Sequence, residues 1–251
     1  MEALTNQALA TLLLSLRIVP TFAFAPPFTF MRVPASVRLV LAVSLAAWLV
    51  AAHPGETWQS NFREVGLIAT ALPELLMGVT FALSLQIAFA ALLTAGRTVD
   101  IQAGYGLAAL IDPTTRAPLP LVGTLFAYAA GAVFFAIGAP ADLLAIWDNA
   151  VAQVPLGAAG VGTNVPLLGA YMSAVFLMAF GAAGLIILVL FVIDLAIAFM
   201  SRTMPQMNVL LLGFQVKTIA TLMVLPVAIA LSIALYVRML RFALQTAAEL
   251  V

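Results

Sequence analysis

Apolar residues follow one another in long stretches along this chain, and charged side chains interrupt them only at intervals. A bilayer core of about 30 Å needs roughly 20 helical residues to cross it. Four stretches without any charged residue reach that length: 75–96, 117–141, 149–193 and 218–237. The residues from 185 to 193 do not alternate between apolar and polar, as the strands of a membrane barrel do. The pattern therefore predicts helices.

Glycine and proline divide the stretches further. The run 149–193 contains several helix breakers between 155 and 166, which indicates a loop there. We therefore predict six helical segments, over 8–30, 37–52, 65–95, 119–147, 166–201 and 207–240. Prolines inside or beside them, such as Pro20, predict kinks, because proline removes a backbone hydrogen bond. The predicted fold is all-α: about six long, Pro-kinked helices in polytopic hydrophobic hairpins, forming a single domain over 1–251.

Composition excludes several classes of protein. The chain is 65% hydrophobic and 8% charged, whereas a soluble domain typically carries about 25% charged residues. Ten basic and ten acidic residues balance, so no basic field is available for nucleic acid. The absence of cysteine excludes disulfides and thiolate metal sites. The signatures of zinc proteases and serine hydrolases are missing. We therefore expect a protein of a membrane or of a very large apolar assembly, and no motif favours an enzyme.

Four ionisable residues lie in or beside the apolar segments: Arg17, Glu74, Asp194 and Lys217. A charge in mid-bilayer costs about 2.5–3.5 kcal/mol on insertion scales, so it is normally paired or functional. Asp194 and Lys217 each lie about eleven residues from the turn expected at 204–207, which gives them equal height in an antiparallel hairpin. We interpret them as a buried ion pair between neighbouring helices. The alternative is a proton-coupled or substrate-binding site.

The segment 96–120 is the least membrane-like part of the chain. It begins with polar residues, contains Gly104 and Gly106, is apolar over 107–111, and continues into Pro113. An apolar stretch held in a non-helical loop must be covered by something. On residue types alone, a re-entrant or packing loop is the simpler interpretation.

Several stretches together resemble the flagellar biosynthetic protein FliR family, which includes the related SctT proteins of type III injectisomes. The matching residues are Arg17-Ile-Val-Pro20-Thr-Phe with Pro26 and Arg38; Ala95-Gly96 to Gly106 with Asp112-Pro113; Val154-Pro-Leu-Gly157; and Pro205-Gln206-Met-Asn208 with Gly213-Phe214 and Lys217. They occur in the expected order over essentially the whole chain. One departure is Gly138-Ala139-Pro140, where many relatives carry Gly-His-His or a similar sequence.

The resemblance implies a subunit of a helical export-gate assembly. Such a subunit forms a conical channel with FliP-like and FliQ-like proteins and works with FlhB-like and FlhA-like export proteins. Unfolded flagellar proteins pass through it across the bacterial inner membrane, at the flagellar basal body. The family is not enzymatic and implies no cofactor.

The resemblance also implies roles for particular residues. The loop over 104–118 is expected to be part of a channel plug, with these plug residues: Gly104, Gly106, Leu107, Leu110, Ile111, Asp112 and Pro113. The expected structural motif residues are Arg17, Pro20, Pro205, Gln206 and Asn208. The competing interpretation is a proton-coupled secondary transporter of a small solute, which the broken helices and the charges at Asp194 and Lys217 fit. Such transporters usually show paired halves, and the sequence shows none.

Overall fold

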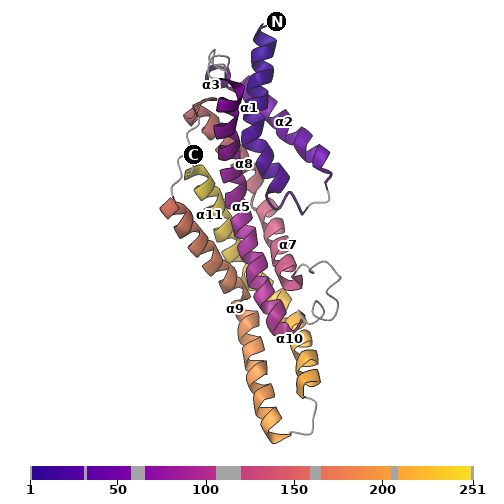
Figure 1. The fold of residues 1–251 in the computed structure, drawn as a ribbon. Helices are drawn as coiled ribbons and strands as arrows, with labels where there is room; N and C mark the ends of the chain where they lie inside the picture. Colours follow the sequence, from indigo (N-terminus) through magenta and orange to yellow (C-terminus); the bar gives the residue numbers. More distant parts are fainter. Residues whose placement is uncertain are drawn as a thin grey trace. The chain divides into compact units, whose positions relative to one another are not determined.

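A computed structural model of the chain describes residues 2–30, 33–57, 66–105, 120–158, 165–204 and 209–249, and Figure 1 shows its helices. The helices are α1 (Glu2–Phe24), α2 (Ala35–Ala52), α3 (Pro54–Thr57), α5 (Leu67–Ala103), α7 (Leu121–Ala136), α8 (Ala139–Gln153), α9 (Val165–Thr203), α10 (Val209–Leu231) and α11 (Ile233–Glu249). The described residues contain no strand. The all-α prediction is confirmed.

Several predicted helix boundaries are wrong, and each has a local cause. The segment expected to run to residue 30 ends at Phe24, just before Pro26 and Pro27, which have no N–H to donate. The segment 119–147 is not one helix, because Gly138 adopts φ 77° and Pro140 stands in the first turn of α8. Proline suits a first turn, where its missing N–H has no helical partner to lose. Residues 138–140, where the sequence departs from many of its relatives, therefore form the start of helix α8.

Two further boundaries differ at the other predicted helices. The helix expected over 65–95 continues to Ala103, through Arg97 and Asp100. The segment expected over 207–240 is two helices, α10 and α11, with Ser232 between them, and α11 continues past residue 240 to Glu249. The Ser232 N–H still donates to the carbonyl of Ala228, at 3.0 Å, so the helical hydrogen bonding is nearly continuous from α10 to α11.

The chain packs as two compact units, the first comprising Met1–Ile87, Phe134–Met172 and Leu240–Val251. Within it α1 and α2 pack against each other. Its core consists of fully buried apolar side chains, among them Leu13, Ile18, Leu49 and Phe81. Apolar burial of this kind is the dominant favourable term in folding.

The second unit comprises Ala88–Val133 and Ser173–Met239. Its α5 and α7 segments approach so closely that a Cβ at Gly96 would overlap the backbone of Gly123. A Cβ at Gly123 would in turn lie 2.7 Å from the carbonyl oxygen of Leu93. The C-terminal half of α9 and α10 run side by side as a hairpin (Figure 1).

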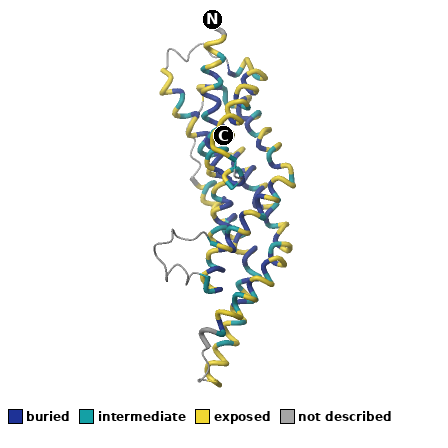
Figure 2. Tube along the Cα trace, turned by 90° about the vertical axis from the view of Figure 1, so that its right-hand side faces the viewer, coloured by how far each residue is buried: buried dark blue, intermediate teal, exposed yellow. Residues whose placement is uncertain are grey.

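Much of the helical surface is apolar and exposed. Within the described residues, five helices are long and apolar enough to cross a bilayer, and α7 with α8 would add a sixth if this bent pair counts as one span. On α9 and α10 the exposed side chains include Phe191, Phe199 and Met223, and the described residues towards the end of their hairpin are largely exposed in Figure 2. Extended exposed apolar surface marks contact with lipid or with partner proteins.

Candidate functional site

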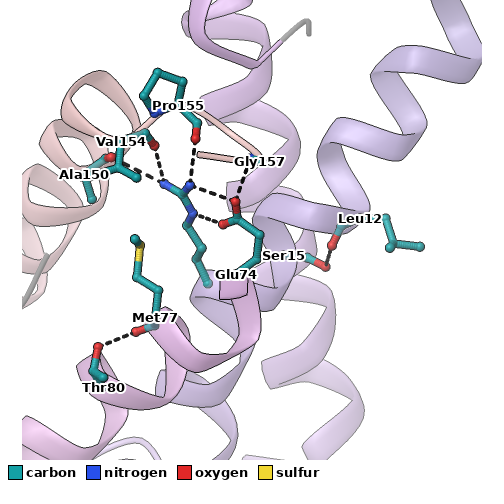
Figure 3. Close-up of polar contacts among 10 residues, drawn as sticks. Leu12, Ser15, Glu74, Met77, Thr80, Ala150, Val154, Pro155 and Gly157 are labelled. Atoms are coloured by element: carbon teal, nitrogen blue, oxygen red, sulfur yellow. Dashed lines mark hydrogen bonds and ion pairs between the residues drawn. The ribbon is translucent and has the colours of Figure 1, made fainter. Parts of the chain in front are cut away.

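Arg17 of α1 and Glu74 of α5 form an ion pair in the first unit (Figure 3). Both side chains are inaccessible to solvent, at 1% and 0% exposure. The guanidinium Nε donates to one carboxylate oxygen of Glu74, and Nη2 donates to the other at 3.0 Å. This two-pronged geometry is the strongest arrangement available to an arginine–carboxylate pair.

The same guanidinium also holds the end of α8. Nη1 donates to the carbonyl oxygen of Val154 at 2.9 Å and to that of Ala150 at 3.4 Å, and Nη2 donates to that of Pro155 at 3.3 Å. The Gly157 N–H donates to Glu74 Oε1 at 2.9 Å. A guanidinium has five N–H donors, and the contacts above use all three of its nitrogens. The arrangement ties α1, α5 and the turn after α8 together.

Two residues of the sequence explain how α1 and α5 come close enough for this pair. Pro20 has no N–H, so the carbonyl of Leu16 loses its helical partner. That carbonyl faces α5 at Gly78, where any Cβ would overlap it. Glu74 lies one turn before Gly78 and therefore projects from the same face of α5. Pro20 and Gly78 together bring the Glu74 carboxylate to Arg17.

Asp194 of α9 and Lys217 of α10 also meet, in the second unit. The Lys217 ammonium lies in ion-pair contact with the Asp194 carboxylate, as their matched heights in a hairpin suggested. The pair is not buried, because 48% of the Asp194 side chain and 20% of the Lys217 side chain are exposed. Lys217 Nζ also donates to the carbonyl oxygen of Gln102, at 3.3 Å. The pair thus links the hairpin to the last turn of α5.

The end of α5 leads into the predicted plug loop and is well defined. Gly104 has φ 88°, its N–H donates to the Ile101 carbonyl at 3.2 Å, and the Tyr105 N–H donates to the Asp100 carbonyl at 2.9 Å. These two bonds with a left-handed glycine form a Schellman motif. The role of Gly104 in the described structure is thus to end a helix.

Tyr105 continues this connection to α10. Its hydroxyl donates to the carbonyl oxygen of Thr218 at 3.4 Å. Burial raises the pKa of the Tyr105 phenol above its ordinary value. The first end of the loop is therefore held by Tyr105 and Lys217 together.

Asp100 holds the other end of the loop. Its Oδ1 accepts the backbone N–H of Val122 at 3.1 Å, in the first turn of α7, where N–H groups have no helical partner. A carboxylate near the N-terminus of a helix also interacts favourably with the helix dipole. Together with the close contact of Gly96 and Gly123, this bond makes a firm stem from the two helices that flank the loop.

The remaining predicted site residues lie outside the described residues. They are the plug residues Gly106, Leu107, Leu110, Ile111, Asp112 and Pro113, and the motif residues Pro205, Gln206 and Asn208. Arg17, Pro20, Gly104, Asp194 and Lys217 are placed as described above.

The sequence did not reveal Glu74 as the partner of Arg17, nor the anchoring roles of Asp100 and Tyr105 at the ends of the loop. Glu74 stood out as a charge in an apolar segment, but its 57-residue separation from Arg17 carries no signal of contact. Asp100 and Tyr105 were read only as part of a polar stretch. The signal that was available is Gly104, since glycine directly after a helical pattern commonly ends the helix.

Comparison with known proteins shows similarity over most of the chain. Residues 8–243 match the family model described as bacterial export proteins, family 1. The flagellar biosynthetic protein FliR of Bacillus subtilis (strain 168) is 28% identical over 227 residues, which are 88% of this chain and 86% of that protein. FliR of Escherichia coli (strain K12) is 25% identical over 201 residues, 79% of this chain and 76% of that protein.

Similarity extends to a second group of proteins. The Yop proteins translocation protein T of Yersinia pestis is 26% identical over 148 residues, 58% of this chain and 57% of that protein. The region matched by the family model contains the Arg17–Glu74 pair, the Asp194–Lys217 pair and both ends of the predicted loop.

Proposed function

This chain belongs to the bacterial export proteins, family 1, and from that premise we propose that it is a core subunit of the flagellar type III export gate. In this role it helps to form and close the channel that passes unfolded flagellar proteins across the bacterial inner membrane. The observation that carries the proposal is the family match over residues 8–243, together with relatives named FliR along most of the chain. Its partners are FliP-like and FliQ-like gate subunits and the FlhB-like and FlhA-like export proteins.

The exposed apolar faces support an assembled state. Large side chains on α2, α9 and α10 are exposed, including Trp48, Phe191 and Met223. Helices that present such faces need other helices or lipid to cover them. Partner subunits of a gate supply that cover.

The stem of the loop supports a closing role for residues 104–118. An apolar constriction excludes ions by dewetting, yet a pushed polypeptide can displace it. The stretch 107–111 has the residues for such a constriction, Leu-Ala-Ala-Leu-Ile. A closing element that moves needs a fixed base, and Asp100, Lys217 and Tyr105 anchor the two ends of the loop to α7 and α10.

Assembly is tested by co-purification and motility. The tagged chain is expressed in a flagellated strain that lacks its own FliR, with and without the FliP-like and FliQ-like proteins. The expected result is restored swimming, partners that co-purify, and poor accumulation without them. Abundant, monodisperse chain without partners, and no rescue of swimming, would contradict the proposal and favour a small-solute transporter.

The closing role has a separate test, with residues 107–111 replaced by Gly and Ser. The expected result is an assembled gate that conducts ions, measured as conductance in planar bilayers or as sodium sensitivity of growing cells. A matched variant with Leu107→Ile and Leu110→Ile keeps the apolar character and should stay closed. If the assembled Gly/Ser variant is as ion-tight as the unchanged protein, the loop is packing and not a plug.

A further inference from the structure

Asp100 of α5 is a buried acid without a counter-charge. Its side chain is 6% exposed. Oδ1 accepts the Val122 N–H, but Oδ2 is buried and has no hydrogen-bond partner among the described residues. None of the ion pairs in the described ranges includes Asp100. Buried polar atoms are normally paired, so the state of this acid needs a physical explanation.

The other charged and titratable groups of the neighbouring helices are engaged elsewhere or exposed. Lys217 of α10 lies in contact with the Asp194 carboxylate of α9. The Tyr105 hydroxyl donates its one proton to a backbone carbonyl of α10. Arg97, on α5 itself, is exposed. Helix α7 contains no charged residue, and its one titratable side chain, Tyr128, is exposed. No described cation therefore balances the buried acid.

The helices beside Asp100 pack too closely to admit water. Gly96 lies one turn before Asp100 and therefore projects from the same face of α5. At this point a Cβ on Gly96 would overlap the backbone of Gly123 in α7, and Gly123 directly follows Val122. Water reaches the acid from this side only if α5 and α7 move apart.

These surroundings favour the neutral form of the acid. An ionised carboxylate that is buried without a counter-charge is so unfavourable that such a group normally takes up a proton instead. The Val122 N–H and the positive end of α7 favour the ionised form, but a helix end offsets only part of the desolvation. The neutral acid keeps its bond to Val122, because its carbonyl oxygen still accepts the N–H.

We propose that Asp100 is a proton switch between α5 and α7. It holds a proton while the two helices are in contact, and the loss of that proton separates them, because the ionised group has to be solvated. Asp100 stands at the base of the loop over 104–118. That base is fixed while Asp100 is protonated and is released when it ionises. The consequence for the channel rests on the proposed closing role of the loop, whereas the protonation of Asp100 is independent of it.

Thermal unfolding of the purified full-length chain in detergent, between about pH 5 and pH 7, tests the protonation. Asp100→Asn has nearly the shape of the neutral acid and cannot ionise. The folded chain keeps a proton that Asp100 of the unfolded chain loses at about pH 4, so the stability of the unchanged chain falls as the pH rises. Its melting temperature should drop relative to that of Asp100→Asn by about 3–5 °C for each pH unit.

The comparison isolates Asp100, because every other titrating group contributes equally to both chains. Asp194→Asn is the matched control, since 48% of the Asp194 side chain is exposed. An exposed carboxylate is ionised in the folded and in the unfolded chain over this pH range. The control should therefore differ from the unchanged chain by the same amount at every pH.

A second measurement follows the two helices directly. The chain has no cysteine, so spin labels attach only at Thr94→Cys on α5 and Leu125→Cys on α7, both at exposed positions. In the chain with Asp100, the distribution of distances between the labels should be narrow at about pH 5. It should shift to longer distances at about pH 9, where the acid ionises. With Asp100→Asn the distribution should be the same at both pH values.

Two results overturn the proposal. The first is a difference in melting temperature between the unchanged chain and Asp100→Asn that stays constant with pH or changes in the opposite direction. The second is a label distance in the Asp100 chain that is the same at both pH values. If Asp100→Asn does not fold, the labels in the Asp100 chain decide alone. Neither measurement involves partners or export, so a chain that passes both but does not restore swimming contradicts the gate proposal alone.

Discussion

Among the described residues, Arg17–Glu74 and Asp194–Lys217 each join a basic side chain to a carboxylate, in opposite surroundings. Arg17 and Glu74 are almost inaccessible to solvent, and the guanidinium also donates to carbonyls at the end of α8. Asp194 and Lys217 touch each other while about half of the aspartate side chain is exposed. The Arg17–Glu74 pair is surrounded by further hydrogen bonds. The Asp194–Lys217 pair joins the two helices of a hairpin, and Lys217 also donates to the last turn of α5.

Burial determines how much each pair matters for folding. Removing one partner of a buried pair leaves an uncompensated charge in a medium that solvates it poorly. A pair exposed to solvent contributes little, because water and salt already screen the charges. The first pair therefore acts as a structural clamp. The second, with about half of the aspartate side chain exposed, is expected to contribute much less.

The largest effect is expected when the clamp is broken. Glu74→Gln leaves the buried Arg17 guanidinium without a counter-charge, at a cost of about 3–5 kcal/mol in the free energy of unfolding. Reduced thermal stability in detergent and low accumulation in membranes would measure it. Glu249→Gln, at an exposed glutamate near the end of α11, should leave both unchanged. A Glu74→Gln chain as stable as this control would show that the clamp is dispensable.

An intermediate effect is expected in the stem that carries the loop. Gly96→Ala places a methyl group against the backbone of Gly123, and such overpacking typically costs about 1–3 kcal/mol. Gly184→Ala on α9 has no neighbouring atom within 4 Å, so it should be neutral or stabilise the helix by up to about 1 kcal/mol. Thermal unfolding of both variants measures the difference. Equal stabilities would mean that α5 and α7 can separate, and the stem would then be as adjustable as the Asp194–Lys217 link.

The smallest effect is expected for the exposed pair. In a double-mutant cycle of Asp194→Asn and Lys217→Gln, the coupling energy in the purified chain should stay below about 1 kcal/mol. It should fall further in high salt, because exposed charges are screened. Chemical unfolding at two salt concentrations measures it. A coupling of about 3 kcal/mol would show that the pair is buried in solution and would remove the contrast with Arg17 and Glu74.

The sequence predicted the type of the elements better than their ends. Long uncharged stretches such as 75–96 leave helices as the only reasonable choice, because each helix satisfies its own backbone polar groups. The end of α5 at Ala103 was missed, because Arg97 and Asp100 look like the start of a loop. In the structure the Asp100 carboxylate has a partner at Val122, which no local pattern reveals.

The two pairs were predictable to different degrees for a similar reason. Asp194 and Lys217 stand on consecutive helices, α9 and α10, with few residues between them, so counting from the expected turn brought them to the same height. Whether the pair is buried depends on which other helices cover the hairpin, and spacing carries no information on that. Arg17 and Glu74 come from helices separated by α2 and α3, and no count along the chain relates them.

The sequence by itself therefore determined the helical class, the membrane character and the pairing across one hairpin, because run length and helical rise are local properties. Only the tertiary structure decided that Arg17 pairs with Glu74. It also decided that the Asp100 carboxylate accepts the N–H of Val122 at the start of α7. Those contacts depend on how closely two backbones approach, and a proline at 20 and glycines at 78, 96 and 123 set that distance. How closely two helices approach depends on the side chains of both helices together, and the pattern along one helix does not show which other helix it contacts.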